Sequence, residues 1–388
     1  MMFKFKKKKS RKIKVYFLCQ YMQGYNKIFD VIECMKNNEL FDAKVLAIPD
    51  NIDLFPKNNE YEFWYSKFGT IVVNSIVNNQ WFDLKKEKPD YVFVQRPYDN
   101  YLPHEFQIET LKQYTKLCYI PYCFELADLR NVILPEFFVK NISLLFCTQR
   151  DEFEYCSNII KNIDDGLCRK VFNLGYPSLY SIVKKNNNSA FKKIDKRNNL
   201  NIIWTPRWTI DKKLCKTSFF EYKSKIIKYM KKNNNINFVF RPHPLTFKNF
   251  IDKGIMTKSQ VDNYLKNFKK TNLYYDCSSD YYDTFADSDI LITDYSSIII
   301  EYFLLNKPII YCYSKLEKMT DFMKQMIDCF YCVKNWMELE NALENLKKGI
   351  DPLKKNRTKL LNIFLKDYQS DVSVKIVEEI KRDYLKLP

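Results

Sequence analysis

The sequence predicts an α/β protein of two doubly wound domains that face a cleft. Its 388 residues are too many for one ordinary domain and suit two domains of roughly 150 to 200 residues each. Short apolar runs of strand length alternate with longer segments of helical periodicity, which favours parallel sheets with helices on both faces. The same series of strands and helices then starts a second time after a polar stretch in the middle of the chain.

The first domain is expected at residues 13–185, behind a basic tail of residues 1–12. An apolar run at Ile13–Cys19, a polar loop and a helical pattern follow one another, which is how a doubly wound unit begins. Further buried strands of this domain are predicted at Lys44–Ile48, Tyr91–Gln95, Leu117–Ile120 and Leu144–Thr148.

A polar stretch at residues 184–199, KKNNNSAFKKIDKRNN, separates the two halves because it has almost nothing to bury. The second domain is therefore expected at residues 198–388. Its strands are predicted at Asn201–Thr205, Asn237–Phe240, Ile290–Thr293 and Pro308–Tyr313, and its helices at Phe219–Lys231, Ser297–Leu305, Met337–Lys348 and Val372–Leu385. The last helix is amphipathic, which would let it pack back across the first domain.

The chain carries 63 basic and 46 acidic side chains, a formal charge of +17, which attracts nucleic acid, anionic lipid or phosphorylated substrates. A Lys-rich composition without a functional cause explains the charge equally well. The tail favours a membrane surface, because Lys6–Lys9, Arg11 and Lys12 precede the first strand. The sequence shows no motif of aromatic residues interleaved with Arg, so no nucleic acid is expected as a partner.

We expect a cytoplasmic protein held peripherally on the inner face of the cell membrane. No apolar stretch approaches the ~20 residues needed to span a bilayer, and the basic start lacks the cleavage pattern of a secretory signal. The 12 cysteines lie scattered in apolar segments, which indicates reduced core thiols. The Cys-x-x-Cys pair of Cys329 and Cys332 has no matching second pair, so no metal site is predicted.

The most informative segment is Ile290–Tyr313, which reads ILITDYSSIIIEYFLLNKPIIYCY. Asp294 and Ser296 suit the N-cap of a helix that begins at Ser297, and the backbone N–H groups of such a helix start bind phosphate. Glu301 lies one turn further on the same face, where a carboxylate accepts hydrogen bonds from ribose hydroxyls. The alternatives are an ordinary capped helix and a Glu301 on a solvated face.

A second segment, NFVFRPHP at Asn237–Pro244, continues past the end of a strand. Arg241 and His243 each precede a proline, which holds the backbone extended and stiff, so that both side chains project towards one cleft. Arg suits bidentate contact with phosphate, and His donates to a phosphoryl oxygen or moves a proton near neutral pH. The alternative is a structural His in a Pro-rich turn.

Weaker signals come from three other strand ends. The segment IIWTPRWT directs Thr205, Pro206 and Arg207 towards the same cleft. In the first domain, FVQRPYDNYLPHE and CYIPYCFEL place polar side chains where an acceptor-binding wall would lie. These side chains are Arg96, Tyr98, His104 and Tyr122.

The TPRW, RPHP and TDYSS segments, in this order and each after a strand, resemble the CDP-glycerol glycerophosphotransferase family, which builds teichoic-acid-like polymers. The resemblance implies the type B glycosyltransferase architecture of two Rossmann-like domains, with the donor nucleotide held mainly by the C-terminal domain. It implies that Glu301 takes the ribose, where the family usually carries Asp. It also implies that the donor's pyrophosphate is bound by Arg241, His243, Ser296 and Ser297.

The sequence departs from the family's pattern in several places. The family's first-domain His-Gly motif, whose His is the expected general base, has no counterpart, because YIPYCF occupies the equivalent place. The segment Gly-x-Pro-Arg-Asn-Asp reads GYPSLY here, so that Ser178 replaces its Arg. Thr205–Arg207 match the family's donor-contact segment only loosely.

From the resemblance we expect transfer of a glycerol-phosphate-type group from a CDP-linked donor to a hydroxyl of a cell-surface glycan or lipid-linked acceptor, with His243 as the catalytic residue. Positioning and electrostatics supply such catalysis without a covalent intermediate. No cofactor is expected, and a divalent ion is left open. Two alternatives stay open: a nucleotide-sugar-dependent glycosyltransferase of the same architecture, and a basic binding protein without activity.

Overall fold

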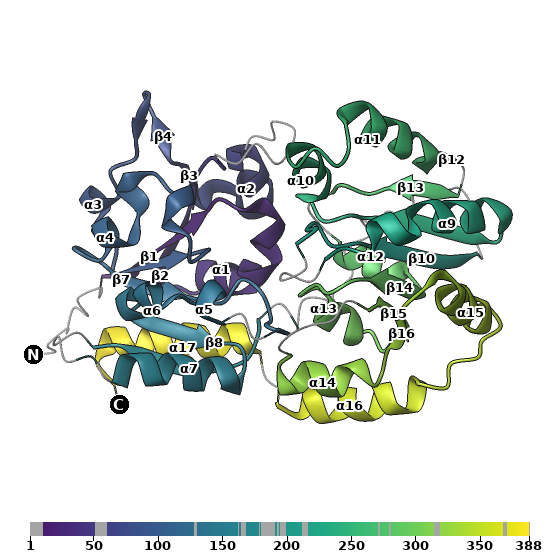
Figure 1. Ribbon diagram of the computed structural model, residues 1–388. Helices are drawn as coiled ribbons and strands as arrows, with labels where there is room; N and C mark the ends of the chain where they lie inside the picture. The colour runs from purple at the N-terminus through teal and green to yellow at the C-terminus, as the bar shows by residue number, and fades with distance from the viewer. Residues whose placement is uncertain are drawn as a thin grey trace, which may run out of the picture.

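The computed structural model describes residues 11–387 except 51–59, 128–129, 162, 164–167, 178, 180–190, 192–193, 195–198, 212–215, 271, 279–280, 314–318 and 368–370. The chain forms two α/β domains that lie side by side, each built around one sheet with helices on both faces (Figure 1). The predicted fold class of two Rossmann-like, doubly wound domains is confirmed. The basic residues 1–10 and most of the predicted boundary at 184–199 lie outside the described residues.

The first sheet has the strand order β3-β2-β1-β6-β7-β8-β9, and all of its neighbouring pairs are parallel. Val15 and Phe17 of β1 enter an apolar core on one face, while Tyr16 and Leu18 enter a separate core on the other. Because both faces are buried, the strand reads as an unbroken apolar run. The strands are β1 (Ile13–Cys19), β2 (Phe41–Ala47), β3 (Val72–Asn74), β6 (Tyr91–Val94), β7 (Lys116–Tyr119), β8 (Leu144–Cys147) and β9 (Lys170–Asn173).

The second sheet has the strand order β12-β13-β11-β10-β14-β15-β16 and is parallel except for β12. The strand order reverses on the two sides of β10, and ligands of open α/β sheets bind beyond the carboxyl ends of the strands at such a point. The strands are β10 (Leu200–Thr205), β11 (Ile236–Phe240), β12 (Lys269–Lys270), β13 (Leu273–Tyr275), β14 (Ile290–Thr293), β15 (Ile309–Cys312) and β16 (Tyr331–Val333).

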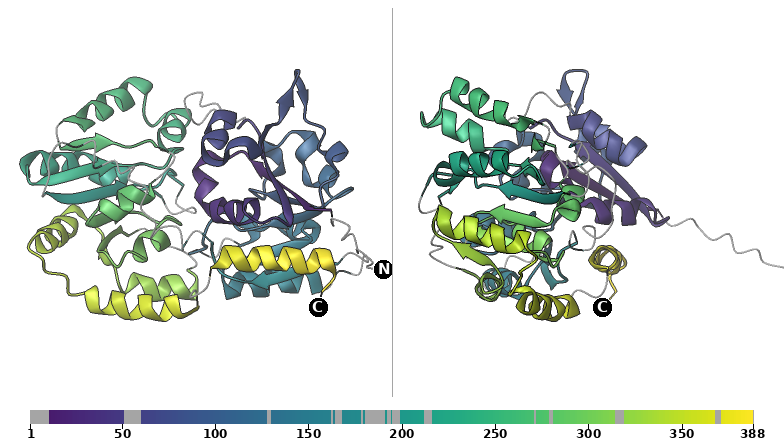
Figure 2. Two further views of the ribbon diagram at one scale, coloured as in Figure 1. Left: turned by 180° about the vertical axis from the view of Figure 1, so that it is seen from behind. Right: turned by 90° about the vertical axis from the view of Figure 1, so that its right-hand side faces the viewer.

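Helices flank both sheets, and a small hairpin of β4 (Ile76–Val77) and β5 (Gln80–Trp81) projects from the first domain (Figures 1 and 2). Short 3-10 turns lie in the loops, among them η1 (Met22–Lys27) and η4 (His104–Phe106). The helices of the first domain are α1 (Phe29–Lys36), α2 (Glu60–Phe68), α3 (Leu84–Glu87), α4 (Ile108–Leu111), α5 (Arg130–Ile133), α6 (Glu136–Asn141) and α7 (Arg150–Lys161). Those after β10 are α9 (Phe219–Lys232), α10 (Thr246–Asp252), α11 (Lys258–Leu265), α12 (Tyr282–Asp287), α13 (Ile299–Phe303), α14 (Asp321–Ile327), α15 (Trp336–Lys347) and α16 (Lys354–Asp367).

The last helix, α17 (Val372–Leu385), returns to the first domain (Figure 1). Its Ile376 and Ile380 are fully buried in the same core as β1 and α1. The carboxylate of Asp383 accepts hydrogen bonds from the Tyr91 hydroxyl and the Lys116 ammonium, both at 2.7 Å. Although α17 lies in the range 198–388 expected for the second domain, it therefore packs as part of the first.

The two domains share an apolar core. Phe124 and Leu126 of the first domain pack in one cluster with residues of α13 and α14. The backbone N–H of Ala127 donates to the Tyr295 hydroxyl at 3.0 Å, and the N–H of Thr320 donates to the carbonyl of Leu126 at 3.1 Å. These contacts join the domains by apolar burial and by hydrogen bonds at once.

One predicted element needs correction. The helix expected at Ser297–Leu305 is shorter, because α13 begins at Ile299 and its N-cap is Ile298, which makes no side-chain capping hydrogen bond. The prediction that Asp294 and Ser296 cap a helix was therefore wrong, and the Asp294 carboxylate has other partners. Among the described helices, none combines the length and hydropathy that a membrane-spanning helix requires.

Candidate functional site

Three of the predicted segments meet at one edge of the second sheet. They follow β10, β11 and β14, which are parallel neighbours in the sheet, so their carboxyl ends lie together. The loops are also tied by their backbones: the N–H of Arg241 donates to the carbonyl of Trp204 at 2.8 Å, and the N–H of His243 points to the carbonyl of Pro206 at 3.4 Å. The convergence of the TPRW, RPHP and TDYSS segments thus follows from sheet topology.

Asp294 joins these loops. Its carboxylate is fully buried and accepts hydrogen bonds from the backbone N–H of Arg207 at 3.0 Å, from the Thr217 hydroxyl at 3.1 Å and from the N–H and hydroxyl of Ser218. Burial raises the pKa of Asp294, while these hydrogen bonds oppose the shift. The Asp294 carboxylate thus fixes the loop after β10 against the end of β14.

Thr205 and Pro206 are buried beneath the same edge. The Thr205 hydroxyl donates to the Thr293 hydroxyl at 2.9 Å, which links the ends of β10 and β14. Arg207 is partly exposed, and its guanidinium lies 4.7 Å from the centre of the Tyr295 ring and donates to the carbonyl of Tyr295 at 2.9 Å. Of these three predicted donor contacts, only Arg207 therefore presents its side chain near the surface of the edge.

Arg241 is held from several sides. Its guanidinium pairs with the Asp276 carboxylate at 2.5 Å, donates to the Ser278 hydroxyl at 3.1 Å and to the Ser278 carbonyl at 2.6 Å. It also lies 5.3 Å from the centre of the Tyr281 ring. A guanidinium fixed in this way loses little conformational freedom when it binds an anion.

His243 is partly buried and has a defined tautomer. The backbone N–H of Leu245 donates to its Nδ1 at 3.1 Å, so Nδ1 carries no proton and Nε2 does. Burial, together with the charge of Arg207, lowers the pKa of His243 to about 3, which keeps the ring neutral at physiological pH. The imidazole can therefore donate a hydrogen bond through Nε2.

Ser296 and Ser297 lie at the same edge, in the turn between β14 and α13, and both are partly exposed. Among the described residues, the structure gives their hydroxyls no hydrogen-bond partner. The helix α13 has only five residues and starts two positions later than expected. This segment therefore offers a phosphate the two serine hydroxyls and a turn. It does not offer the start of a helix.

Glu301 is more deeply buried than expected for a residue that binds a ribose. It is fully buried on α13, and its carboxylate accepts hydrogen bonds from the Tyr281 hydroxyl and, at 3.4 Å, from the Tyr282 hydroxyl. It also forms an ion pair with Lys27 of the first domain. The alternative of a solvated Glu301 is wrong, and ribose binding by Glu301 stays a prediction.

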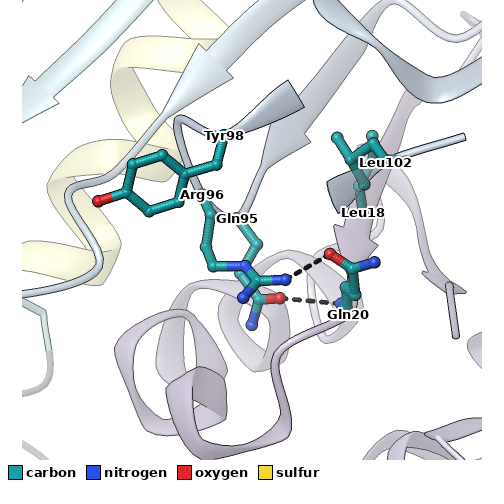
Figure 3. A pocket seen from close by; sticks show the side chains of 6 residues that line it. All are labelled: Leu18, Gln20, Gln95, Arg96, Tyr98 and Leu102. Atoms are coloured by element: carbon teal, nitrogen blue, oxygen red, sulfur yellow. Dashed lines mark hydrogen bonds between the residues drawn. The ribbon is translucent and has the colours of Figure 1, made fainter. Parts of the chain in front are cut away.

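The first domain contributes amides and a guanidinium beyond the ends of β1 and β6. Figure 3 shows a cavity of about 10 Å³, enough for one water molecule, lined by polar side chains that contact one another. The Gln95 Oε1 accepts from the backbone N–H of Gln20 at 2.8 Å, and the Arg96 guanidinium donates to the Gln20 Oε1. Leu18, Tyr98 and Leu102 complete the lining.

Tyrosines surround this group. The Arg96 guanidinium lies 5.1 Å from the ring centre of Tyr21, and its charge is offset by the Asp50 carboxylate at 3.7 Å. The hydroxyls of Tyr98 and Tyr122 are hydrogen bonded to each other at 2.9 Å. Three of the four predicted acceptor-side residues, Arg96, Tyr98 and Tyr122, therefore lie among aromatic and amide groups near one another.

The fourth predicted acceptor-side residue, His104, lies elsewhere. It is exposed at η4 and lines a separate cavity with Trp81 of β5 and with Asp83 and Lys85 beside α3. A strand end in the sequence does not say where the following loop goes, and this loop turns away towards the hairpin. His104 does not belong to the acceptor-side group.

Sequence reasoning missed Lys27, Asp276 and Tyr281. Lys27 pairs with Glu301, and Asp276 and Tyr281 hold Arg241. Burial lowers the pKa of Lys27 to about 7, and the electrostatic interaction with Cys123 opposes that shift. Nothing in the sequence separates this lysine from the many others, although its place in the loop after β1 was a usable signal.

The described cysteines are free thiols, and Cys329 is buried while Cys332 is exposed. Within the described residues, no group of three or more His, Cys, Asp or Glu side chains is placed to hold a metal ion.

Comparison with protein families identifies the chain. The family described as CDP-glycerol:poly(glycerophosphate) glycerophosphotransferase matches residues 154–381, which is more than half of the sequence. The chain belongs to this family. The recognised resemblance is thus confirmed, and at the level of the family the protein is an enzyme that transfers glycerol phosphate. A search of curated protein sequences gives no match.

Solved structures share the fold over nearly the whole length. A putative UDP-N-acetylglucosamine 2-epimerase from Listeria monocytogenes has a TM-score of 0.60 at 12% identity, with 97% of this chain and 98% of that chain covered. The UDP-GlcNAc 2-epimerase from Neisseria meningitidis bound to UDP-GlcNAc has 0.59 at 15%, with 95% and 100% covered. The wall teichoic acid polymerase TagF has 0.57 at 14%, with 96% and 89% covered. At such identities the likeness shows the fold alone.

Proposed function

We propose that this family member transfers a polyol-phosphate group of the glycerol-phosphate type from a CDP-linked donor to a hydroxyl of a cell-surface glycan or lipid-linked acceptor. The observation that carries the proposal is the meeting of the Arg207, Arg241 and His243 loops at one sheet edge in a chain of this family. Two guanidinium groups and a neutral imidazole that donates are the groups that a pyrophosphate requires.

In the proposed reaction, the acceptor hydroxyl attacks the phosphorus that carries the polyol. A new phosphorus–oxygen bond forms, the bond from that phosphorus to the bridging oxygen of the pyrophosphate breaks, and CMP leaves with the bond's electrons. Arg241 and Arg207 offset the charge on the departing phosphate, and His243 donates through Nε2 to a phosphoryl oxygen. Fixed donors of this kind act without a reorganisation cost during the reaction.

His243 is thereby assigned electrostatic stabilisation and not proton removal. Its Nδ1 is occupied by the Leu245 N–H, and a ring with a pKa of about 3 is a weak base. The proton of the acceptor hydroxyl must leave by another route. The first domain faces the acceptor in this proposal, with the partly exposed side chains of Tyr98 and Tyr122 offering hydroxyls to a hydroxyl-rich molecule.

The donor proposal is tested by incubating the protein with CDP-glycerol, CDP-ribitol, UDP-N-acetylglucosamine and a preparation of short polyol-phosphate or glycan acceptors. Release of CMP from a CDP-polyol that depends on the acceptor supports the proposal. Release of UDP from the nucleotide sugar, with no CMP, would establish the glycosyltransferase alternative instead. A thermal-shift series with CDP and UDP adds a readout without turnover, because a ligand that binds only the folded state raises the melting temperature.

We further propose that transfer needs no resident cofactor. CMP release by dialysed protein supplied only with donor, acceptor and Mg²⁺ supports this proposal, and release that requires an added organic cofactor would overturn it. Prolonged treatment with EDTA then decides the open question of a divalent ion.

A further inference from the structure

Lys27 reaches from the first domain into the second. It ends η1, in the loop after β1, and its ammonium forms an ion pair with the Glu301 carboxylate on α13. The same ammonium donates to the Tyr281 hydroxyl at 3.1 Å. The Lys27 side chain is only 11% exposed and that of Glu301 only 1%, so solvent and salt screen this pair far less than a surface ion pair.

Aromatic rings from both domains enclose the ion pair. The Lys27 ammonium lies 5.3 Å from the ring centre of Tyr176 in the first domain, and 5.8 and 5.9 Å from those of Tyr281 and Tyr282 in the second. Ring faces at this range attract a cation, more strongly when it is desolvated. The lysine of one domain is therefore held by a carboxylate and two rings of the other.

This contact conflicts with the binding of a ribose by Glu301. The two carboxylate oxygens already accept from Lys27, Tyr281 and Tyr282, and the carboxylate is almost inaccessible. Ribose hydroxyls can reach Glu301 only if the Lys27 ammonium withdraws. The ammonium and the ribose hydroxyls are both hydrogen-bond donors, so ribose hydroxyls can take the place of the ammonium on the carboxylate.

We propose that the Lys27–Glu301 pair is a lock between the domains that is closed when the donor site is empty and opened by the donor nucleotide. Lys27 occupies Glu301 until ribose hydroxyls replace it, so it is a positioning residue that links occupation of the donor site to the contact between the domains. The inference rests on the donor site proposed above.

The proposed lock predicts by how much nucleotide affinity changes when the lock is removed. When only a fraction of the protein is in the binding-competent state, the apparent dissociation constant rises by the reciprocal of that fraction. If the lock is closed in about nine-tenths of the molecules, its removal tightens nucleotide binding about ten-fold. Replacement of Glu301 by Gln also removes the lock but gives less of this gain, because a neutral amide oxygen accepts from ribose hydroxyls more weakly than a carboxylate.

The experiment uses the full chain in three single variants. Lys27→Met keeps the apolar stem of the lysine but removes the charge, and Glu301→Gln keeps the shape of the carboxylate. Lys116→Met is the matched control, because Lys116 also pairs with a carboxylate, that of Asp383 at 2.7 Å, but inside the first domain. Calorimetric titration with CDP and with UDP measures affinity, and small-angle X-ray scattering without nucleotide measures the radius of gyration.

We expect Lys27→Met to bind CDP about ten-fold more tightly than the unaltered protein, Glu301→Gln to bind it more weakly than Lys27→Met, and Lys116→Met to match the unaltered protein. Both lock variants should show a larger radius of gyration without nucleotide. A merely structural contact would change the CDP affinity of both lock variants equally. Equal or weaker CDP binding by Lys27→Met, or an unchanged radius of gyration, would overturn the proposal.

Two further measurements cover the cases in which the proposed donor is wrong or a variant does not fold. If neither CDP nor UDP binds to any variant, the proposed donor is wrong, whereas the scattering result still decides whether the pair holds the domains together. If Lys27→Met does not fold because it leaves a buried carboxylate unpaired, the double variant Lys27→Met/Glu301→Gln removes both charges. Its radius of gyration must then exceed that of the Lys116→Met control, and an equal value overturns the lock.

Discussion

The two sheet edges that carry the predicted site residues differ in chemistry. In the second domain, Arg207, Arg241 and His243 sit on loops that are joined by backbone hydrogen bonds and by the Asp294 carboxylate. In the first domain, the corresponding loops present amides and tyrosine hydroxyls around the Arg96 guanidinium, which pairs with Asp50 as Arg241 pairs with Asp276.

This difference indicates a division of labour. Fixed positive groups on stiff loops suit a pyrophosphate, whose place must not change during the reaction. Neutral groups that both donate and accept suit a hydroxyl-rich acceptor, for which charge gives no selectivity. Tyr21 stands between the two sets: burial raises its pKa to about 12, and both Arg96 and Arg241 act on its hydroxyl electrostatically.

The largest expected effect comes from His243→Ala. Loss of the Nε2 donor should lower the rate of CMP release by about 10² to 10³, as is typical when one fixed donor to a developing charge is removed. The fold should survive, because the substitution leaves only the Leu245 N–H without its acceptor, at a cost of about 1 to 3 kcal/mol. The matched control is His104→Ala, which removes the chain's other histidine from an exposed position. If the two variants are equally active, the charged edge of the second sheet, which carries Arg207, Arg241 and His243, does not hold the reacting phosphate.

A second test compares Arg241→Met with Arg96→Met. Arg241→Met should weaken CDP binding about 10- to 100-fold, since a hydrogen bond to a charged group contributes about 1.5 to 3 kcal/mol. Arg96→Met should leave CDP binding unchanged and raise the KM of the acceptor. Calorimetry and steady-state kinetics measure the two effects separately. Weaker CDP binding in both variants would mean that the division between the edges is wrong.

A third test concerns the membrane. We propose that residues Lys4–Lys14 attach the first domain to an anionic membrane without an inserted helix. Removal of residues 1–12 should reduce co-sedimentation with anionic vesicles about ten-fold, and 0.5 M salt should have a similar effect through screening. Arg11 and Lys14 already pair with Asp90 and Glu87, so the effect should come from the residues before them. Equal binding with and without the tail contradicts the proposal.

The smallest effect is a pH dependence of stability at the charged edge. Because the pKa of His243 is lowered to about 3, the unfolded chain takes up a proton before the folded one when the pH falls below about 6.5. The free energy of unfolding should therefore decrease from pH 7 to pH 5.5 by about 1 kcal/mol more than in His243→Gln, whose side chain can still accept from Leu245. Urea unfolding of both proteins at the two pH values measures this difference. A parallel decrease in both would show that His243 is freely solvated.

The strands and the meeting of the three motifs were predictable from sequence, because strands buried on both faces leave continuous apolar runs. β1, β14 and α17 have the limits that the sequence predicted. Edge strands such as β3 and β9 were missed because they are short and partly exposed, without such a run.

The partners of the site residues were not predictable, because they come from distant parts of the chain. Asp294 reads as a helix cap, yet it bonds to Ser218, 76 positions away. Glu301 reads as a ribose ligand, yet its partner is Lys27, 274 positions away. Local spacing shows which side chains share a helix face or a strand end, whereas these pairs depend on how the two domains dock.

The return of α17 to the first domain means that both ends of the chain belong to the same folding unit. The second domain is consequently an insertion between β9 and α17, connected at two points. A fragment cut after residue 185 would lack α17 and expose the apolar faces of Val31 and Met35, so it should aggregate. A domain exchange among relatives should instead replace the segment between β9 and α17 and keep α17 with the first domain, into whose core it packs.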